Sequence, residues 1–268
     1  MRFEKWQALG NDYLIVTEPV TGDLVRRLCD RHRGVGADGV LVVAAADQPG
    51  HVARVQILNP DGSEAELSGN GVRQAIMYLH RHGWTQARQF SIQTVAGEIR
   101  PTILDERTCR VDMGRITLGG AVVAAGHAGQ ELRIGNPQFA VRVEDRDQLA
   151  ALDLAVEGPP IEHDPRFPDR TNVSFWTELG PGAIRARIFE RGVGETLSSG
   201  TGAIGAAAAH VLRGGDSPVT VHLDGGELLV AIDDDLHVEL TGWAEPVFAG
   251  EWLVGQGETS DQRPGATH

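Results

Sequence analysis

The most constraining feature of this sequence is that its two halves repeat one motif. Residues 64–81 read EAELSGNGVRQAIMYLHR, and residues 195–212 read ETLSSGTGAIGAAAAHVL. Ser68 and Ser199 each follow a glutamate by four positions, and each precedes Gly-x-Gly. Self-similarity at a fixed offset is the signature of a duplicated structural unit. The chain is therefore expected to fold as two copies of one unit, with this motif offset by 131 positions.

Three further matches occur in the same order in both halves. ARVQIL at 53–58 and IRARIF at 184–189 alternate apolar and polar residues, as half-buried strands do. FSIQTVAGEIRPTI and VTVHLDGGELLVAI each place two β-rich runs around an A-G-E or G-G-E turn, which predicts a hairpin. LGNDYLIV at 9–16 matches IGNPQFAV at 134–141. Each unit is thus predicted to contain several strands.

Each unit should also contain a helix that begins just after S-G-x-G, over residues 72–82 and 203–213. The second helix is almost free of charge, and a helix that is apolar all round is buried. The predicted fold is α/β of the α+β type: two pseudosymmetric domains, each a mostly antiparallel sheet wrapped around a central helix. We place the domains at residues 1–115 and 116–254 and expect residues 255–268, which are polar, to be a disordered tail.

Composition restricts the classes of function. The formal net charge of −13 argues against a nucleic-acid backbone or an anionic membrane as partner. No apolar run has the length of a signal peptide or a membrane span, so a cytoplasmic protein is expected. Cys29 and Cys109 form no disulfide framework, and no metal-binding motif is present. These features favour a small-molecule ligand and no metal, and they leave a homodimer open.

The two S-G-x-G turns can be interpreted in two ways. Helix N-termini carry unpaired N–H groups and the positive end of the helix dipole, so they bind carboxylates or phosphates well. Duplicated domains would bring the two turns together on one cleft, with Ser68 and Ser199 on opposite faces. Taken singly, however, each serine is a preferred helix N-cap. The glycines kept in both copies, which a cap does not require, favour the binding site.

Other polar residues close to these turns have structural alternatives too. Asn59 precedes Pro-Asp-Gly, a turn signature, and its counterpart in the second half is Glu190. Glu190 and Arg191 could be a solvated pair, or Arg191 could clamp a carboxylate through two hydrogen bonds. Asn172, at the start of a β-rich run, could be an ordinary loop asparagine.

Taken together, these segments resemble the diaminopimelate epimerase family over about residues 1–254. The resemblance is carried by ALGNDYLIV, RHRGVGADGVL, NPDGSEAELSGNGVR, GNPQ, RFPDRTNV, ERGVGETLSSGTGA and LDGGEL. It implies a cofactor-independent isomerase that interconverts L,L- and meso-diaminopimelate in lysine synthesis. One residue would remove the α-proton of the amino acid while a residue on the opposite face delivers one. By position these two residues are Ser68 and Ser199.

The resemblance also implies substrate contacts. The helix N-termini at Gly69-Asn70 and Gly200-Thr201 would hold the α-carboxylate and stabilise developing negative charge. The remaining positions that match the family's substrate contacts are Asn11, Asn59, Asn136, Asn172, Glu190 and Arg191. Among them, Arg191 with Asn59 and Asn172 would bind the distal carboxylate and amine.

This sequence departs from the family at the reacting groups. The family has cysteines where Ser68 and Ser199 stand, a histidine where Gln138 stands, and often a further cysteine at Gln74. A serine hydroxyl is far harder to deprotonate than a thiol and needs an adjacent base. Glu190 is the expected base, although it cannot serve both faces. Alternative functions are therefore an amino-acid-binding protein without turnover, and a racemase or dehydratase acting on another amino acid.

Overall fold

The sequence repeat appears in the structure as two sheets with the same strand order. The computed structural model describes residues 1–65 and 67–253. The first sheet runs β18 (Glu245–Glu251), β1 (Arg2–Ala8), β2 (Asn11–Val16), β3 (Gly39–Ala44), β4 (Ala53–Leu58), β5 (Ile92–Thr94), β6 (Gly97–Ile99). The matching run of the second sheet is β9 (Thr117–Ala124), β10 (His127–Ile134), β11 (Asn136–Arg142), β12 (Asn172–Gly180), β13 (Ala183–Glu190), β15 (Val219–Leu223), β16 (Gly226–Ile232).

Strand directions repeat in the same way. The pairs β2–β3 and β4–β5 are parallel, and so are their counterparts β11–β12 and β13–β15. The other pairs in both sheets are antiparallel, including the predicted hairpins β5–β6 and β15–β16. The second sheet continues beyond β16 through β17 (His237–Trp243), β8 (Thr108–Arg115) and β7 (Pro101–Ile103), and β14 (Gly194–Thr196) pairs with β13. The predicted fold class is confirmed.

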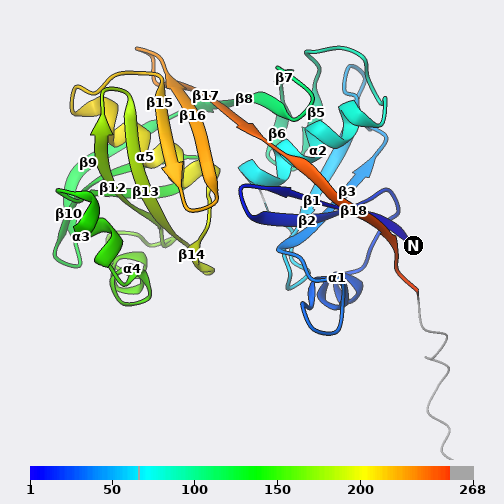
Figure 1. The fold of residues 1–268 in the computed structure, drawn as a ribbon, viewed down its shortest axis with the longest axis horizontal. Coiled ribbons are helices and arrows are strands. Elements are labelled where there is room, and N and C mark those ends of the chain that lie inside the picture. The colour runs from blue at the N-terminus through cyan, green and yellow to red at the C-terminus, as the bar shows by residue number, and fades with distance from the viewer. Residues whose placement is uncertain (66, 254–268) are drawn as a thin grey trace, which may run out of the picture.

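The two halves exchange strands. β7 and β8 precede the predicted boundary but belong to the second sheet, whereas β18 lies in the second half but pairs with β1 of the first sheet. β18 can be followed in Figure 1 as it crosses between the two halves. β8 and β17 pair with each other, with Val111 opposite Leu240. These strands cross the predicted boundary between residues 115 and 116, which remains a prediction; the predicted tail at 255–268 lies outside the described residues.

The two repeated helices begin earlier than the predicted residues 72 and 203. α2 spans Gly69–Arg81 and α5 spans Gly200–Leu212. Ser68 and Ser199 are their N-caps, with extended backbones and Oγ atoms that accept hydrogen bonds from Gly71 N and Gly202 N. The predicted starts were wrong because the glycines and the polar residue of S-G-x-G already form the first helical turn. The capping role of both serines is confirmed.

One large apolar core encloses both helices. Its residues come from α2, α5 and the inner faces of both sheets. The predicted burial of α5 is confirmed, since its residues from Gly200 to His210 are all buried. Three shorter helices were not predicted: α1 (Gly22–Cys29), α3 (Arg146–Ala151) and α4 (Leu154–Glu162). They cover two smaller apolar clusters, α1 in the first half and α3 with α4 in the second. Cys29 and Cys109 are buried free thiols.

The N-termini of α2 and α5 touch. A β-carbon built on Gly69 would lie 3.3 Å from the Cα of Gly200, and a β-carbon built on Gly200 would lie 3.3 Å from the Cα of Gly69. Leu240 of β17 packs against the same contact, with its Cδ2 3.2 Å from the β-carbon built on Gly200. Glycine, which has no β-carbon, allows the two helix backbones to approach this closely without displacing either one. This contact, which we call the helix junction, is where the predicted carboxylate site lies.

Gly200→Ala tests the closeness of the junction. The added methyl group meets the backbone of the opposing helix, which cannot rotate away, so we expect the free energy of unfolding to fall by about 1–3 kcal/mol. Urea denaturation monitored by circular dichroism measures the change. Gly180→Ala is the matched control, because a β-carbon there meets nothing within 4 Å and should change stability by less than about 0.5 kcal/mol. Equal effects of the two substitutions would contradict the tight contact.

Candidate functional site

The helix junction joins residues from both halves of the chain. Ser68 and Ser199 immediately precede the two touching glycines. Asn70 on α2 donates from Nδ2 to the carbonyl oxygen of Ser198 at 3.2 Å and to its Oγ at 2.9 Å. This asparagine therefore links the first turn of α2 to the loop that leads into α5. The amides of Gly69 and Gly200 lie in the first helical turns, where helix geometry provides no acceptor within the helix.

Ser199 lies beside a carboxylate. Its hydroxyl donates to Glu190 Oε2 at 3.0 Å, and Thr196 Oγ1 donates to the other carboxylate oxygen at 2.8 Å. Burial raises the pKa of Glu190, although the two hydroxyl hydrogen bonds oppose the rise. A carboxylate with a raised pKa that contacts a hydroxyl can act as its general base. Glu190, the base expected from the sequence, thus contacts Ser199, and it forms no salt bridge with Arg191.

Ser68 has a different neighbour. Tyr13 on β2 donates from its hydroxyl to Ser68 Oγ at 3.2 Å. Burial raises the pKa of Tyr13 to about 12, so the phenol is neutral at physiological pH. No partner for Ser68 was predicted from the sequence, where Glu190 was expected to serve one face alone. The two serines are therefore equivalent in the repeat but not in their hydrogen-bonded partners.

A buried cation lies beneath the junction. Arg73, which is fully buried, donates to the Gly69 carbonyl oxygen at 3.1 Å and to Asn70 Oδ1 at 2.6 Å. Burial lowers the pKa of Arg73 to about 10, which still leaves it protonated at neutral pH. Among the described residues, no carboxylate forms a salt bridge with it. A buried charge without a partner is costly, so Arg73 and the two helix N-termini together favour an anion at the junction.

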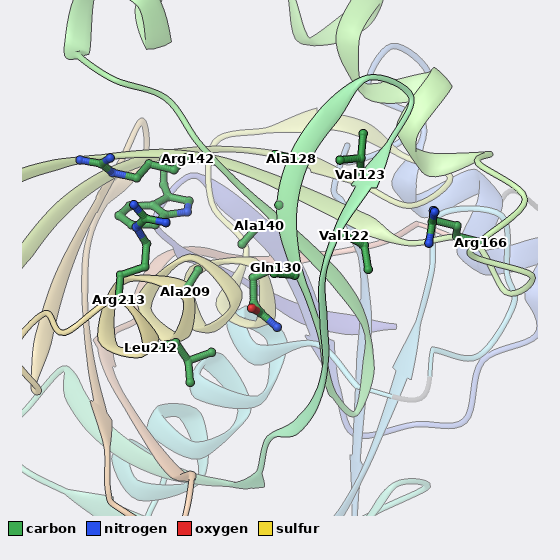
Figure 2. Close-up of a pocket in the computed structure, with 13 residues that line it drawn as sticks. Val122, Val123, Ala128, Gln130, Ala140, Arg142, Arg166, Ala209, Leu212 and Arg213 are labelled. Atoms are coloured by element: carbon green, nitrogen blue, oxygen red, sulfur yellow. The ribbon is translucent and has the colours of Figure 1, made fainter.

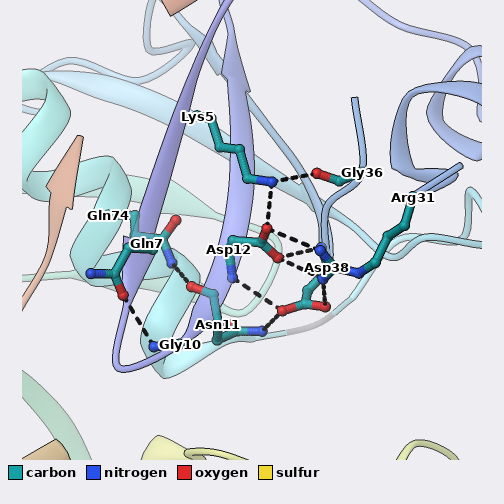
Figure 3. Close-up of polar contacts among 9 residues, drawn as sticks. All are labelled: Lys5, Gln7, Gly10, Asn11, Asp12, Arg31, Gly36, Asp38 and Gln74. Carbon is teal, nitrogen blue, oxygen red and sulfur yellow. Dashed lines mark hydrogen bonds and ion pairs between the residues drawn. The ribbon is translucent and has the colours of Figure 1, made fainter. Parts of the chain in front are cut away.

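Asn11 is held by a cluster of charged residues (Figure 3). Its Nδ2 donates to Asp38 Oδ2 at 2.9 Å, and its backbone carbonyl accepts from Gln74 Nε2 on α2 at 3.0 Å. Arg31 bridges Asp38 and Asp12 at 2.6 and 2.8 Å. Lys5 completes this ion cluster, 2.7 Å from Asp12. The cluster fixes the turn that carries Asn11 and directs its amide nitrogen.

The second half holds its asparagines differently. Asn136, the counterpart of Asn11, accepts from Gln138 Nε2 at 2.6 Å. Gln138 is buried against Gly205 of α5, and its Oε1 has no hydrogen-bond partner among the described residues. Asn172 is buried at the start of β12, and its Oδ1 accepts from the backbone N–H of Arg191 at 2.8 Å. Asn172 thereby fixes the loop after Glu190.

Two residues that were predicted to contact the substrate form hydrogen bonds with neighbouring protein groups. Asn59 donates from Nδ2 to Ser63 Oγ at 3.0 Å, as its turn signature indicated. Arg191 donates from Nη1 to the carbonyl oxygen of Asp169 at 2.9 Å. Both side chains are partly exposed, so a ligand would have to compete with these hydrogen bonds. Their roles as substrate contacts remain predictions.

Three residues of the site were missed from the sequence. Tyr13 lies in LGNDYLIV, and the apolar run that follows it suggests only a strand residue. Asp38 lies in RHRGVGADG, a segment that carries the family resemblance but for which no role was predicted. Arg73 lies within α2, where a helix-surface cation is the ordinary expectation. Of the three, only Asp38 could have been identified from the sequence, because an aspartate in a glycine-rich loop often hydrogen-bonds to the backbone of a turn.

A surface groove lies apart from the junction. It runs between the β9–β10 hairpin and the end of α5 and includes Arg142, Trp176 and Arg213 in its lining (Figure 2). None of the residues predicted for the site lines this groove. In the described part of the chain, no three His, Cys, Asp or Glu side chains gather as a metal site would require. Among residues 1–65 and 67–253, no helix combines the length and apolar character needed to cross a membrane.

Comparison with known proteins gives a consistent family match. The family model for diaminopimelate epimerase matches residues 3–119 and 132–247. A diaminopimelate epimerase of Desulforudis audaxviator is 41% identical, and the match covers 94% of this chain and 99% of that protein. A diaminopimelate epimerase of Pelotomaculum thermopropionicum is 38% identical with the same coverage.

Solved structures share the fold at much lower identity. A Bacillus anthracis phenazine biosynthesis protein of the PhzF family superposes with a TM-score of 0.75 at 16% identity, covering 95% of this chain and 99% of that one. A probable proline racemase from Agrobacterium radiobacter has a TM-score of 0.75 at 18% identity, covering 96% and 94%. These two likenesses concern the fold alone.

Asp12→Asn tests the ion cluster through the pH dependence of stability. Burial raises the pKa of Asp12, but hydrogen bonds from Arg31 and Lys5 prevail and lower it to about 2. Its stabilising contribution is therefore complete above the ordinary aspartate pKa of about 4 and is lost as the pH falls from there towards 2. The variant should unfold at lower urea concentration at neutral pH, and its deficit should shrink over this acidic window.

The control for this prediction is Asp216→Asn, which changes an exposed aspartate in the same way. Urea unfolding of both variants and of the native protein at several pH values provides the comparison. A deficit of Asp12→Asn that stays constant from neutral to acidic pH would contradict the prediction.

Proposed function

Because this chain belongs to the diaminopimelate epimerase family, we propose that the helix junction interconverts L,L- and meso-diaminopimelate with Ser68 and Ser199 on opposite faces of the α-carbon. The family relationship makes the protein an isomerase of lysine biosynthesis that works without pyridoxal phosphate. The observation that supports the two-serine site is the contact of the helix N-termini that directly follow the two serines. We further propose that the enzyme acts on the free amino acid in the cytoplasm.

The junction would bind the α-carboxylate of the substrate. The first-turn amides of Gly69, Asn70, Gly200 and Thr201 supply donors from both sides, and Arg73 adds a full positive charge beneath them. When the α-proton leaves, negative charge moves onto this carboxylate. Donors already in position around it are then worth about 3–4 kcal/mol each in lowering the barrier. The junction would therefore stabilise the carbanion as well as bind the ground state.

Glu190 would make Ser199 a usable base. A serine hydroxyl needs an adjacent base to take up a proton, and the Glu190 carboxylate accepts its hydrogen bond at 3.0 Å. The raised pKa of Glu190 brings that carboxylate closer to the range in which a general base is effective. The distal amine and carboxylate of the substrate would be bound by Arg191 and Asn59, which are partly exposed, together with the buried Asn172. Asn11 and Asn136 are the other proposed substrate contacts.

Restoring thiols tests this proposal. The native protein should exchange the α-hydrogen of L,L-diaminopimelate for deuterium, and Ser68→Ala and Ser199→Ala should each lose epimerisation. The double variant Ser68→Cys, Ser199→Cys should raise kcat/KM by about 10²–10⁴-fold, because a thiol near a helix N-terminus ionises far more readily than a hydroxyl. Deuterium incorporation and product formation are followed by NMR.

Ser91→Cys, which adds a thiol outside the junction, is the control and should leave the rate unchanged. A folded double-cysteine variant without activity would show that the substrate is wrong. A native protein that binds diaminopimelate in calorimetry but exchanges no α-hydrogen would instead favour the amino-acid-binding alternative.

A further inference from the structure

The hydroxyls of Ser68 and Ser199 are used in opposite ways. A serine hydroxyl has one hydrogen to donate and two lone pairs that accept. Ser199 accepts from Gly202 N at 3.3 Å and gives its hydrogen to Glu190, which leaves one lone pair free. Ser68 accepts from Gly71 N at 3.1 Å and from the Tyr13 hydroxyl at 3.2 Å, so both lone pairs are occupied. Its own hydrogen is the part left for a ligand.

This difference matches the needs of an epimerase, in which one face must take a proton and the other must supply one. Ser199 presents a lone pair backed by a carboxylate, and Ser68 presents a hydrogen backed by a phenol. We propose that Tyr13 is the proton source of the Ser68 face, so that Ser68 and Tyr13 form a donor pair opposite the Ser199–Glu190 acceptor pair. This inference rests on the proposed function and extends it to a residue outside the family's substrate contacts.

The proton transfers balance as follows. The bond between the α-carbon and its hydrogen breaks, Ser199 Oγ takes that proton, and the hydrogen of Ser199 moves to Glu190 Oε2. The electron pair spreads into the bound α-carboxylate. A new bond to hydrogen forms on the opposite face from the Ser68 hydroxyl, and Tyr13 returns a proton to Ser68 Oγ. Glu190 ends neutral and Tyr13 ends as a phenolate, and after product release water that enters the emptied junction restores both through the hydroxyls of Ser199 and Ser68.

The surroundings of Tyr13 fit this role. Its ring lies over Gly39, its register partner on β3, and a β-carbon built there would lie 2.5 Å from the ring. The missing side chain at position 39 therefore makes the room that brings the phenol to Ser68. Tyr13 is 5% exposed, which keeps bulk water from competing for its proton. Burial raises the pKa of the phenol, and the charges of Glu190 and Asp38, with buried Cys29, raise it further. The phenol therefore stays protonated.

Tyr13→Phe separates this role from a structural one, because it removes only the hydroxyl. Each epimer of the substrate is incubated with enzyme in D2O, and exchange with retention is measured beside epimerisation. For the epimer whose α-hydrogen faces Ser199, the variant should lose about 10²-fold in epimerisation while exchange with retention persists. For the other epimer, both exchange and epimerisation should fall. Tyr78→Phe, at the one other tyrosine of the chain, should behave as the native protein.

A second measurement leaves the hydroxyl in place. In the Tyr78→Phe background, Tyr13 is the one remaining tyrosine, so biosynthetic incorporation of 3-fluorotyrosine alters it alone. Fluorination lowers the pKa of the phenol. In the plot of epimerisation rate against pH, the alkaline limb should therefore move to lower pH. Glu190, Asp38 and Cys29 are unchanged in this experiment, so the displacement reports on Tyr13.

The outcomes are distinct. The split between exchange and epimerisation, together with the displaced alkaline limb, would support the donor pair. Tyr13→Phe that epimerises as fast as Tyr78→Phe would overturn it while the proposed function stands. A folded Tyr13→Phe that loses all reactions of both epimers equally would also overturn it, because that pattern indicates a structural role. A native protein that exchanges neither epimer would overturn the proposed function and the donor pair together.

Discussion

The contact between the first turns of α2 and α5 is the constraint on which the rest of the structure depends. It brings together two like-signed helix ends, and Arg73 adds a buried positive charge beneath them. This concentration of positive charge occurs in a chain whose net charge is −13. The exchanged strand β18 and the β8–β17 pair hold the halves together against it. A bound carboxylate would complete the electrostatic balance, which supports the proposed binding of an amino acid at the junction.

Duplication supplies the symmetry of the site, and divergence between the copies supplies its chemistry. The strand order, the two capped helices and the paired glycines are the same in both halves. The groups behind the serines are not: β13 ends at Glu190, whereas the corresponding end of β4 is followed by Asn59. The first copy instead brings Tyr13 to its serine from β2. Proton transfer across an α-carbon needs an acceptor on one face and a donor on the other, and in the proposed mechanism these different neighbours supply the two roles.

Much of this fold could be predicted from the sequence because the repeat constrains it locally. The alternation of apolar residues, the hairpin turns and the S-G-x-G caps depend on near neighbours. α4 could not be predicted, because Pro159 and Pro160 within it oppose a helix and only packing against the second sheet explains its formation. The exchanged strands and the contact of Tyr13 with Ser68, 55 positions away, depend on long-range packing that periodicity does not encode. The arginine beneath the junction was missed for the same reason.

The most direct test of the shared carboxylate site is a titration followed by NMR of the backbone amides. Protein labelled with nitrogen-15 is titrated with L,L-diaminopimelate, and the amide resonances of Gly69, Asn70, Gly200 and Thr201 are followed. If both helix N-termini hold one carboxylate, the amide protons of all four residues should move downfield with a single dissociation constant. Movement confined to one of the two helices, or no movement at either, would contradict the claim that the two halves build one anion site.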